Sequence, residues 1–246
     1  MSQSPFAIAP RPVVSIPITA EEVRFPVSRI FCVGQNYAEH AREMGGMPER
    51  EPPFFFMKSA EALVTDGQAM VYPPLTANLH FEVELVVALS KGGSNIALTD
   101  ALDHVFGYAV GLDMTRRDMQ AEAKATRRPW DLSKNFANAG PLGPITRAAS
   151  HPASSDTVTL EVDGVLRQAG TIGDMIWSVP EIIATLSRYQ PLVAGDLIYT
   201  GTPAGVGPVA IGSEMVARIA GLPALHCAVI GPPGDFESGA LCVLEP

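Results

Sequence analysis

The stretch from residue 80 to residue 89 constrains the fold of this chain more than any other. It reads HFEVELVVAL, with polar and apolar residues alternating over the first six positions. Side chains of a β-strand point alternately to opposite faces, so the pattern predicts a strand with His80, Glu82 and Glu84 on one face. The apolar residues 86–89 that follow indicate that the strand runs through the interior.

Two carboxylates on one face of such a strand repel each other. At an effective dielectric constant near 20, two like unit charges about 4 Å apart cost roughly 4 kcal/mol. A fold keeps them where they meet water, share a proton or bind a cation. The residues alone leave open a solvent-exposed strand face and a metal site. Oxygen ligands favour a hard ion, either Mg²⁺ or Mn²⁺, with Ca²⁺ as an alternative.

The composition excludes several classes of function. A formal net charge of −9 over 246 residues argues against a nucleic-acid or anionic-membrane partner. No apolar run reaches the 18 residues of a membrane span, and the first ten residues lack a signal-peptide pattern. Three cysteines without CxxC spacing suit a reducing compartment, so we expect a cytoplasmic protein.

Turn and capping signals predict an α+β, mainly β fold. Frequent prolines predict an extended N-terminal segment over residues 1–26, followed by a single catalytic domain over 27–246. Strands are predicted at 30–34, 54–57, 105–112 and 197–200, with a hairpin at 160–167. Capping boxes at Asn36–Glu39, Thr115–Asp118 and Ser178–Glu181 predict three helices, and residues 45–53 predict a mobile loop.

Asp113 is a third acidic candidate, because it ends the apolar strand predicted at 105–112. With Glu82 and Glu84 it would supply three oxygen ligands and leave other coordination positions for water and substrate. A helix-capping role before Thr115 is the alternative reading of Asp113.

His40 and Glu43 are three residues apart, so they share one face of the predicted helix. A carboxylate that accepts a hydrogen bond from imidazole raises the basicity of the ring, and such a pair can deprotonate water. An accidental pair on a surface helix is the alternative. The adjoining loop could fold over a bound ligand.

Several further residues are candidates for substrate contacts. Lys58 and Lys134 lie in apolar surroundings, where a buried lysine needs an anionic partner. Gln120 lies in the helix that follows Asp113. The segment 200–207, TGTPAGVG, could let amides and hydroxyls such as those of Gly201 and Thr202 approach an anion, or it could be a structural turn.

In order and spacing, seven segments resemble the fumarylacetoacetate hydrolase family. They are CVGQNYAEHAREMG (32–45), PFFFMKSAEALV (53–64), NLHFEVELVVAL (78–89), GYAVGLDMTRRDMQ (107–120), PWDLSK (129–134), RQAGTIGDMIWSVPEII (167–183) and GDLIYTGTPAGVG (195–207). The resemblance covers nearly the whole chain. It implies a mixed β-sandwich roll with a few peripheral helices, commonly a homodimer.

The resemblance also implies roles for the candidate residues. Mg²⁺ or Mn²⁺ would be bound by Glu82, Glu84 and Asp113. His40 and Glu43 would activate water from a lid helix. The remaining candidates, Lys134, Gln120, Thr202, Gly201 and Lys58, would surround a small anionic dicarbonyl substrate, with Lys134 stabilising the oxyanion.

The function implied is hydrolysis of a carbon–carbon bond in a β-diketo acid (an acylpyruvate). The segments REPPFFFMK and MIWSVPEIIA are most similar to bacterial members that hydrolyse fumarylpyruvate in gentisate breakdown. The alternatives are decarboxylation of a 2-oxo acid of the oxaloacetate type, isomerisation of a hydroxydienoate diacid, and non-catalytic binding of a divalent ion or small ligand.

Three departures from the family pattern bear on the substrate. Gln35 replaces a usual arginine, Ser59 replaces a usual proline, and residues 135–140, NFANAG, replace a more typical Gly-Phe-Asp with Ser-Ala-Pro. The last two change the surroundings of both pocket lysines.

Overall fold

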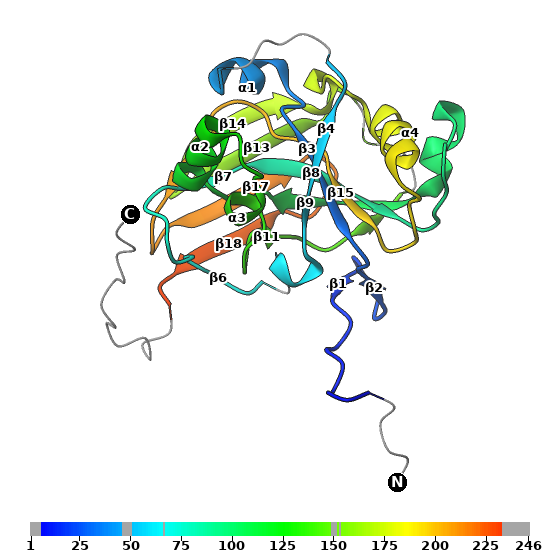
Figure 1. Cartoon of the computed structure of the whole chain (residues 1–246), viewed down its shortest axis with the longest axis horizontal. Coiled ribbons are helices and arrows are strands. Elements are labelled where there is room, and N and C mark those ends of the chain that lie inside the picture. Colours follow the sequence, from blue (N-terminus) through cyan, green and yellow to red (C-terminus); the bar gives the residue numbers. More distant parts are fainter. Residues whose placement is uncertain (1–5, 46–50, 66, 149–151, 153, 233–246) are drawn as a thin grey trace.

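The structure is a computed structural model that describes residues 6–45, 51–65, 67–148, 152 and 154–232. Two large sheets form its body (Figure 1). The six-stranded sheet has the order β12 (Thr146–Arg147), β9 (Val105–Leu112), β8 (Val83–Leu89), β15 (Leu197–Tyr199), β3 (Ile30–Gly34), β4 (Phe54–Lys58). The five-stranded sheet has the order β14 (Val165–Thr171), β13 (Thr157–Val162), β17 (Glu214–Ile219), β18 (Leu225–Ile230), β6 (Met70–Val71).

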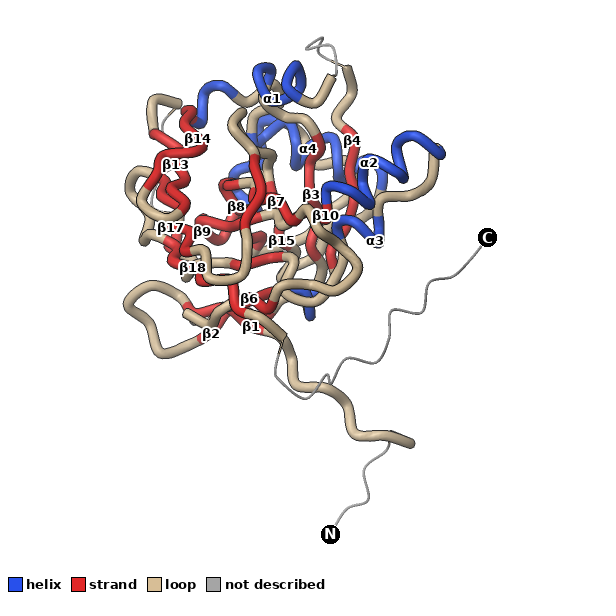
Figure 2. The backbone as a smooth tube through the Cα atoms, turned by 90° about the vertical axis from the view of Figure 1, so that its left-hand side faces the viewer, coloured by secondary structure: helices blue, strands red, loops and turns tan. Residues whose placement is uncertain are grey.

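Smaller sheets and short helices complete the fold. Three strands pair in the order β10 (Thr115–Arg116), β7 (Leu79–Phe81), β16 (Gly207–Val209), while β11 (Gly140–Pro141) pairs with β5 (Leu63–Val64) and β1 (Ser15–Pro17) with β2 (Arg24–Pro26). The α-helices are α1 (Ala38–Glu43), α2 (Arg117–Thr126), α3 (Asp131–Lys134) and α4 (Val179–Tyr189), and the 3₁₀ helices are η1 (Ala60–Ala62), η2 (Leu98–His104) and η3 (Ile172–Asp174). The helices lie around the strands (Figure 2), which confirms the predicted mainly β class with peripheral helices.

The strand β8 is buried on both faces, as its apolar run predicts. Leu85 and Val87 belong to one core cluster, which includes side chains of the five-stranded sheet and of α4. Val86 and Ala88 point the other way, into a second cluster that includes the β1–β2 hairpin. Full burial of each such valine or leucine contributes about 1.5–3 kcal/mol relative to exposure. The two layers thereby fix the strand that carries Glu84.

Local signals locate two elements correctly. Asp163 and Gly164 both have positive φ, 52° and 75°, and form the turn between β13 and β14. At the start of α4 the side chain of Glu181 accepts hydrogen bonds from the backbone and the hydroxyl of Ser178, so this capping box is confirmed.

The capping box predicted at Asn36 is wrong. Helix α1 follows Tyr37, and no side chain caps it. The amide of Asn36 instead donates to the carbonyl oxygens of Trp177 and Thr200, 2.9 and 2.8 Å away. Asn36 therefore ties the start of α1 to two distant segments.

The capping box predicted at Thr115 is also wrong, although the helix is present. Thr115 lies in β10, and α2 begins at Arg117 without a side-chain cap. The carboxylate of Asp118 accepts from the hydroxyl of Thr76 over 2.6 Å and from the N–H of Ala77 over 2.9 Å. It thereby holds the segment before β7, and it also accepts from the N–H of Met119 in its own helix over 2.9 Å.

Near the N-terminus the chain extends away from the body of the molecule (Figure 1). The carbonyl of Val14 accepts from the N–H of Val27 over 2.8 Å, and β1 and β2 pair as a short antiparallel unit. The central part of the predicted mobile loop, residues 46–50, lies outside the described residues. None of the helices in the described part of the chain has the length and apolar character that a membrane crossing requires.

Candidate active site

The three predicted acidic residues converge where the two central strands end. Glu84 pairs with Gly111 across β8 and β9, and the N–H of Asp113 donates to the carbonyl of Glu82 over 2.8 Å. This register places all three carboxylates on one face. One oxygen from each lies within 4.8 Å of the other two, and all three residues are buried. The long strand predicted from His80 onward is interrupted at Glu82, between β7 and β8.

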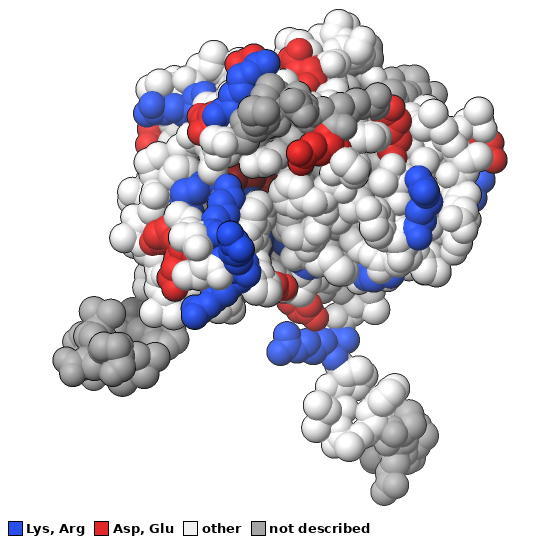
Figure 3. Space-filling model, turned by 45° about the horizontal axis from the view of Figure 1, so that its top comes forward, with Lys and Arg blue, Asp and Glu red and all other residues white. Residues whose placement is uncertain are grey.

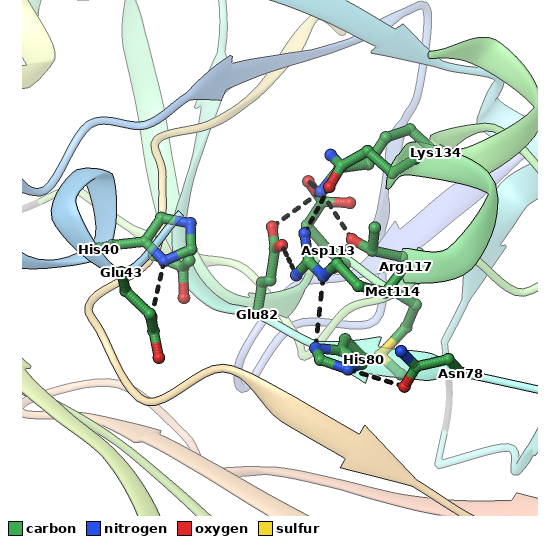
Figure 4. Close-up of polar contacts among 12 residues, drawn as sticks. His40, Glu43, Asn78, His80, Glu82, Asp113, Met114, Arg117 and Lys134 are labelled. Atoms are coloured by element: carbon green, nitrogen blue, oxygen red, sulfur yellow. Dashed lines mark hydrogen bonds and ion pairs between the residues drawn. The ribbon is translucent and has the colours of Figure 1, made fainter. Parts of the chain in front are cut away.

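Lys134, at the end of α3, is bound to two of these carboxylates (Figure 4). Its Nζ donates to Glu82 Oε2 and Asp113 Oδ2, each at 2.8 Å, and to the hydroxyl of Thr115 at 2.7 Å. Burial alone would lower the pKa of Lys134, but the charges of Asp113 and Glu82 outweigh burial and raise this pKa. An ammonium group has three N–H donors, so these acceptors occupy all of them.

Lys58 is equally enclosed by protein. Its Nζ lies 2.8 Å from Asp113 Oδ1 and donates to the carbonyl oxygens of Met114, at 3.3 Å, and of Lys134. Its side chain is fully buried, and Lys58 is not among the residues that line the cleft. Its position therefore suits neutralisation of Asp113 from behind the site.

Arg117, which the sequence reasoning did not single out, completes the cationic surroundings. Its guanidinium donates to Glu82 Oε1 over 2.5 Å and to Gln120 Oε1 over 2.6 Å. Its Nε donates to His80 Nδ1 over 3.3 Å, and His80 Nε2 lies 2.9 Å from Asn78 Oδ1. Figure 4 shows this chain of contacts running from β7 to the acidic cluster. Arg117 and Gln120 are three residues apart on α2, a spacing that the sequence does display.

His80 acts as an acceptor in this chain. Burial, followed by the charge of Arg117, lowers the pKa of His80 to about 4. The imidazole is therefore neutral near pH 7, and its Nδ1 can accept from Arg117 while its Nε2 donates to Asn78.

The three carboxylates differ in their contacts with basic side chains, and the pKa values of Glu82 and Glu84 shift in opposite directions. Burial favours protonation of Glu82, but Lys134 and Arg117 hold the pKa of Glu82 well below its usual range. Burial, together with the charges of Asp113 and Glu82, raises the pKa of Glu84 well above its usual range. Among the ion pairs of the described residues none reaches Glu84, which accepts one N–H bond from Gly201 over 2.8 Å. A divalent cation held by the three carboxylates fits this arrangement, because it would stabilise the ionised form of Glu84.

His40 and Glu43 form the predicted pair on α1. His40 Nδ1 lies 3.2 Å from Glu43 Oε2, and the Glu43 carboxylate also accepts from the N–H of Gly205. This hydrogen bond favours the tautomer with the proton on Nδ1, which leaves Nε2 as a proton acceptor. Figure 4 shows the imidazole across an open space from Glu82, and both residues line one cleft.

The other polar walls of the cleft include Gln120, Lys124 and Thr202. Acidic side chains lie at the bottom of a hollow that basic side chains flank (Figure 3). The Gln120 oxygen is taken by Arg117, so its NH₂ group can donate to a ligand. The Thr202 oxygen accepts from Gln168, so its own O–H can do the same.

Gly201 acts through its backbone. Its N–H is used by Glu84, and its φ of +99° together with a gap of only 2.6 Å from a hypothetical Cβ to Asn36 Cβ requires glycine. The structure thus gives the N–H of Gly201 a contact with Glu84, a candidate metal ligand, where a substrate contact is predicted.

Two of the departures from the family pattern contact each other. The N–H of Ser59 donates to Asn135 Oδ1 over 2.8 Å. A proline at residue 59 has no N–H and could not make this bond, so the Asn135 side chain has this partner only because residue 59 is not proline. The third, Gln35, lines the cleft with a φ of +55°.

A family model and two known relatives match most of this chain. The model of the fumarylacetoacetate (FAA) hydrolase C-terminal family matches residues 29–230. The chain is 42% identical over 182 residues to a fumarylpyruvate hydrolase of Ralstonia sp., covering 74% of this chain and 94% of the relative. It is 41% identical over 204 residues to a mitochondrial oxaloacetate tautomerase of Homo sapiens, covering 82% and 92%.

A solved structure shows the same architecture. The fumarylpyruvate hydrolase of Pseudomonas aeruginosa, in complex with Mn²⁺ and pyruvate, superimposes with a TM-score of 0.89 at 46% identity. The match covers 92% of this chain and all of that chain.

Proposed function

Because the chain belongs to the fumarylacetoacetate hydrolase family, we propose that it hydrolyses an acylpyruvate, with fumarylpyruvate cleaved to fumarate and pyruvate. The observation that carries the proposal is the pairing, in one cleft, of a triple carboxylate cluster with a histidine–glutamate pair. The cluster suits a 2-oxo acid bound at a cation, and the pair suits activation of water.

The cation is proposed to be Mg²⁺ or Mn²⁺, bound by Glu82, Glu84 and Asp113. When bound, it supplies Lewis-acid stabilisation of negative charge on the 2-oxo acid end of the substrate. Lys134 and Arg117 hold Glu82 ionised, so the ligand is ready at neutral pH.

His40 and Glu43, on α1, carry out the proton transfer from water. His40 takes a proton from water through Nε2, while Glu43 orients the ring and stabilises the imidazolium that forms. The hydroxide attacks the ketone of the acyl group. The bond between this carbon and the methylene of the pyruvate half then breaks, and the released enolate of pyruvate takes up the proton that His40 removed from water, which restores the neutral imidazole.

Oxygen atoms of the substrate need hydrogen-bond donors as charge develops on them. Lys134 donates to three protein acceptors. Gln120 and Thr202 line the cleft, and their oxygens accept from protein groups, so their N–H and O–H donors can serve a ligand. We therefore propose that Gln120 and Thr202 donate hydrogen bonds to the substrate oxygens. Lys134 instead holds the carboxylates of Glu82 and Asp113 in position.

The test is turnover of fumarylpyruvate with Mg²⁺ or Mn²⁺, followed by loss of the enol absorbance and by product analysis. We expect fumarate and pyruvate in equal amounts, and no turnover by a variant carrying both Glu82→Ala and Glu84→Ala. Absence of turnover by the unchanged protein, or full turnover by the double variant, would refute the proposal.

The similarity to oxaloacetate tautomerase supports a second candidate, keto–enol interconversion of a 2-oxo diacid in the same cleft. This reaction needs only proton transfer and breaks no carbon–carbon bond. Product analysis therefore separates the two candidates, because keto–enol interconversion yields no fragments and hydrolysis yields two.

Family membership also supports a homodimer, a cytoplasmic location and a place in gentisate breakdown as further parts of the proposal. Sedimentation analysis of the purified chain tests the first of these.

A further inference from the structure

Lys124 extends the polar face that α2 turns toward the cleft. Arg117, Gln120 and Lys124 are spaced i, i+3 and i+7, and all three line the same cleft. At 1.5 Å per residue, Lys124 lies about 10 Å along the helix axis from Arg117. It is therefore at the far end of the cleft wall from the Arg117–Glu82 contact.

A fixed aromatic surface holds this lysine. Its Nζ lies 5.2 Å from the centroid of the Trp130 ring. Trp130 is itself packed edge-on by Phe54, with 5.3 Å between centroids, and contacted by Phe56 at 6.0 Å. Trp130 and Phe56 also line the cleft. The ammonium group of Lys124 is thus positioned against an aromatic ring.

The charge of Lys124 is not neutralised by the described part of the protein. Arg117 is paired with Glu82, and Lys134 with Glu82 and Asp113, whereas no ion pair of the described residues involves Lys124. Burial, followed by repulsion from Arg117, lowers the pKa of Lys124. An anion beside the ammonium group would oppose both effects on this pKa, because it would stabilise the charged form.

We infer that Lys124 binds a second carboxylate of the substrate, at the end remote from the 2-oxo acid. The inference rests on the proposed function and narrows the substrate class to acylpyruvates whose acyl group ends in a carboxylate. Such a molecule has one anionic end for the metal cluster and another for Lys124. An acylpyruvate with a neutral acyl group leaves Lys124 unpaired.

Binding of inert analogues tests this without turnover. The matched pair is 2-oxoheptanedioate and 2-oxoheptanoate, which differ only in the terminal carboxylate, titrated calorimetrically into the Mn²⁺-loaded protein. We expect Lys124→Gln to weaken the diacid about 10- to 100-fold, the range of a charged hydrogen bond, and to change the monoacid by less than about twofold. Lys124→Arg should keep most of the preference, and Arg128→Gln, an exposed cation near the same helix end, should leave it unchanged.

Steady-state kinetics on two substrates test the role of Lys124 a second time. Lys124→Gln should raise KM for fumarylpyruvate about 10-fold or more and leave acetylpyruvate nearly unaffected. Equal losses on both substrates, or an unchanged diacid preference in the titrations, overturn the inference. If the unchanged protein hydrolyses neither acylpyruvate, the proposed function fails, and the titrations still decide the role of Lys124.

Discussion

The side-chain amide of Gln168 donates to the hydroxyl of Thr202 over 2.8 Å and thereby sets the direction of the Thr202 O–H. The same amide donates to the carbonyl of Pro203 over 2.7 Å and accepts from the N–H of Val83 over 3.0 Å. Gln168 is completely buried. One side chain of β14 therefore joins the loop after β15 to the start of β8, next to Glu84.

Replacement Gln168→Leu should destabilise the protein by about 3 kcal/mol, because it leaves several buried polar groups without partners. This loss corresponds to a decrease in Tm of roughly 6–12 °C for a domain of this size. It should also lower kcat/KM well below the unfolding temperature, since Thr202 loses its orientation. Thermal unfolding and steady-state kinetics on one preparation measure both.

The matched control is Gln68→Leu, at an exposed position, which should change stability by less than about 0.5 kcal/mol. A Gln168→Leu protein as stable and active as the unchanged chain would show that the three contacts are unimportant.

Sequence patterns predict the parts of this structure that local chemistry determines. The turn at Asp163–Gly164 needs only positive φ at two neighbouring residues, and the Ser178–Glu181 box is closed within one helical turn. Alternation along residues 80–85 places Glu82 and Glu84 on one face. These features involve residues within four positions of one another.

Features that depend on distant partners are mispredicted or missed. Asn36 has a good capping sequence, but Trp177 and Thr200 use its amide. Gln168 contacts residues 34 and 85 positions away, and nothing near it in the sequence signals this. The predicted oxyanion role of Lys134 ignores the three acceptors that the fold brings to its ammonium group.

Lys134→Met should strongly destabilise the metal-free protein. The change leaves Glu82 and Asp113 short of a buried counter-charge, and removal of one partner of a buried ion pair costs about 3–5 kcal/mol. A divalent cation can replace the lost charge, so saturating Mn²⁺ should raise Tm more in the variant than in the unchanged protein. Thermal unfolding with and without Mn²⁺ measures the difference.

Lys91→Met, at an exposed site, serves as the control and should show the Mn²⁺ response of the unchanged protein. An equal or smaller Mn²⁺ effect in Lys134→Met would mean that the ammonium group and the cation do not share these carboxylates.

His80 should make the protein less stable in acid. Its folded-state pKa of about 4 lies below its ordinary value of 6.5, so the unfolded chain binds more protons between these values. Stability is therefore lost as the pH falls from about 6.5 toward 4, and this contribution is constant above 6.5. His80→Asn should flatten that part of the pH dependence, as measured by urea unfolding at pH 4.5, 5.5 and 7.

Replacement of the exposed His226 by asparagine is the control. If both variants lose stability with acid as steeply as the unchanged protein, His80 does not remain neutral in the folded state.

Binding of Mn²⁺ should strengthen with pH because of Glu84. Its pKa is raised in the metal-free protein, so above about pH 4.5 the folded chain retains a proton that the unfolded chain has released. Metal-free stability therefore falls as pH rises through this range, until Glu84 ionises. A cation at the site requires the carboxylate and must displace that proton. The Mn²⁺-induced rise in Tm should accordingly be larger at pH 8 than at pH 6.

Calorimetric titration with Mn²⁺ in two buffers of different ionisation enthalpy counts the proton directly. Proton release should be present in the unchanged protein and in Glu214→Gln, an exposed control on β17, and it should be lost in Glu84→Gln. Release that persists unchanged in Glu84→Gln would place the displaced proton on another group. Glu84 would then already be ionised before the metal arrives.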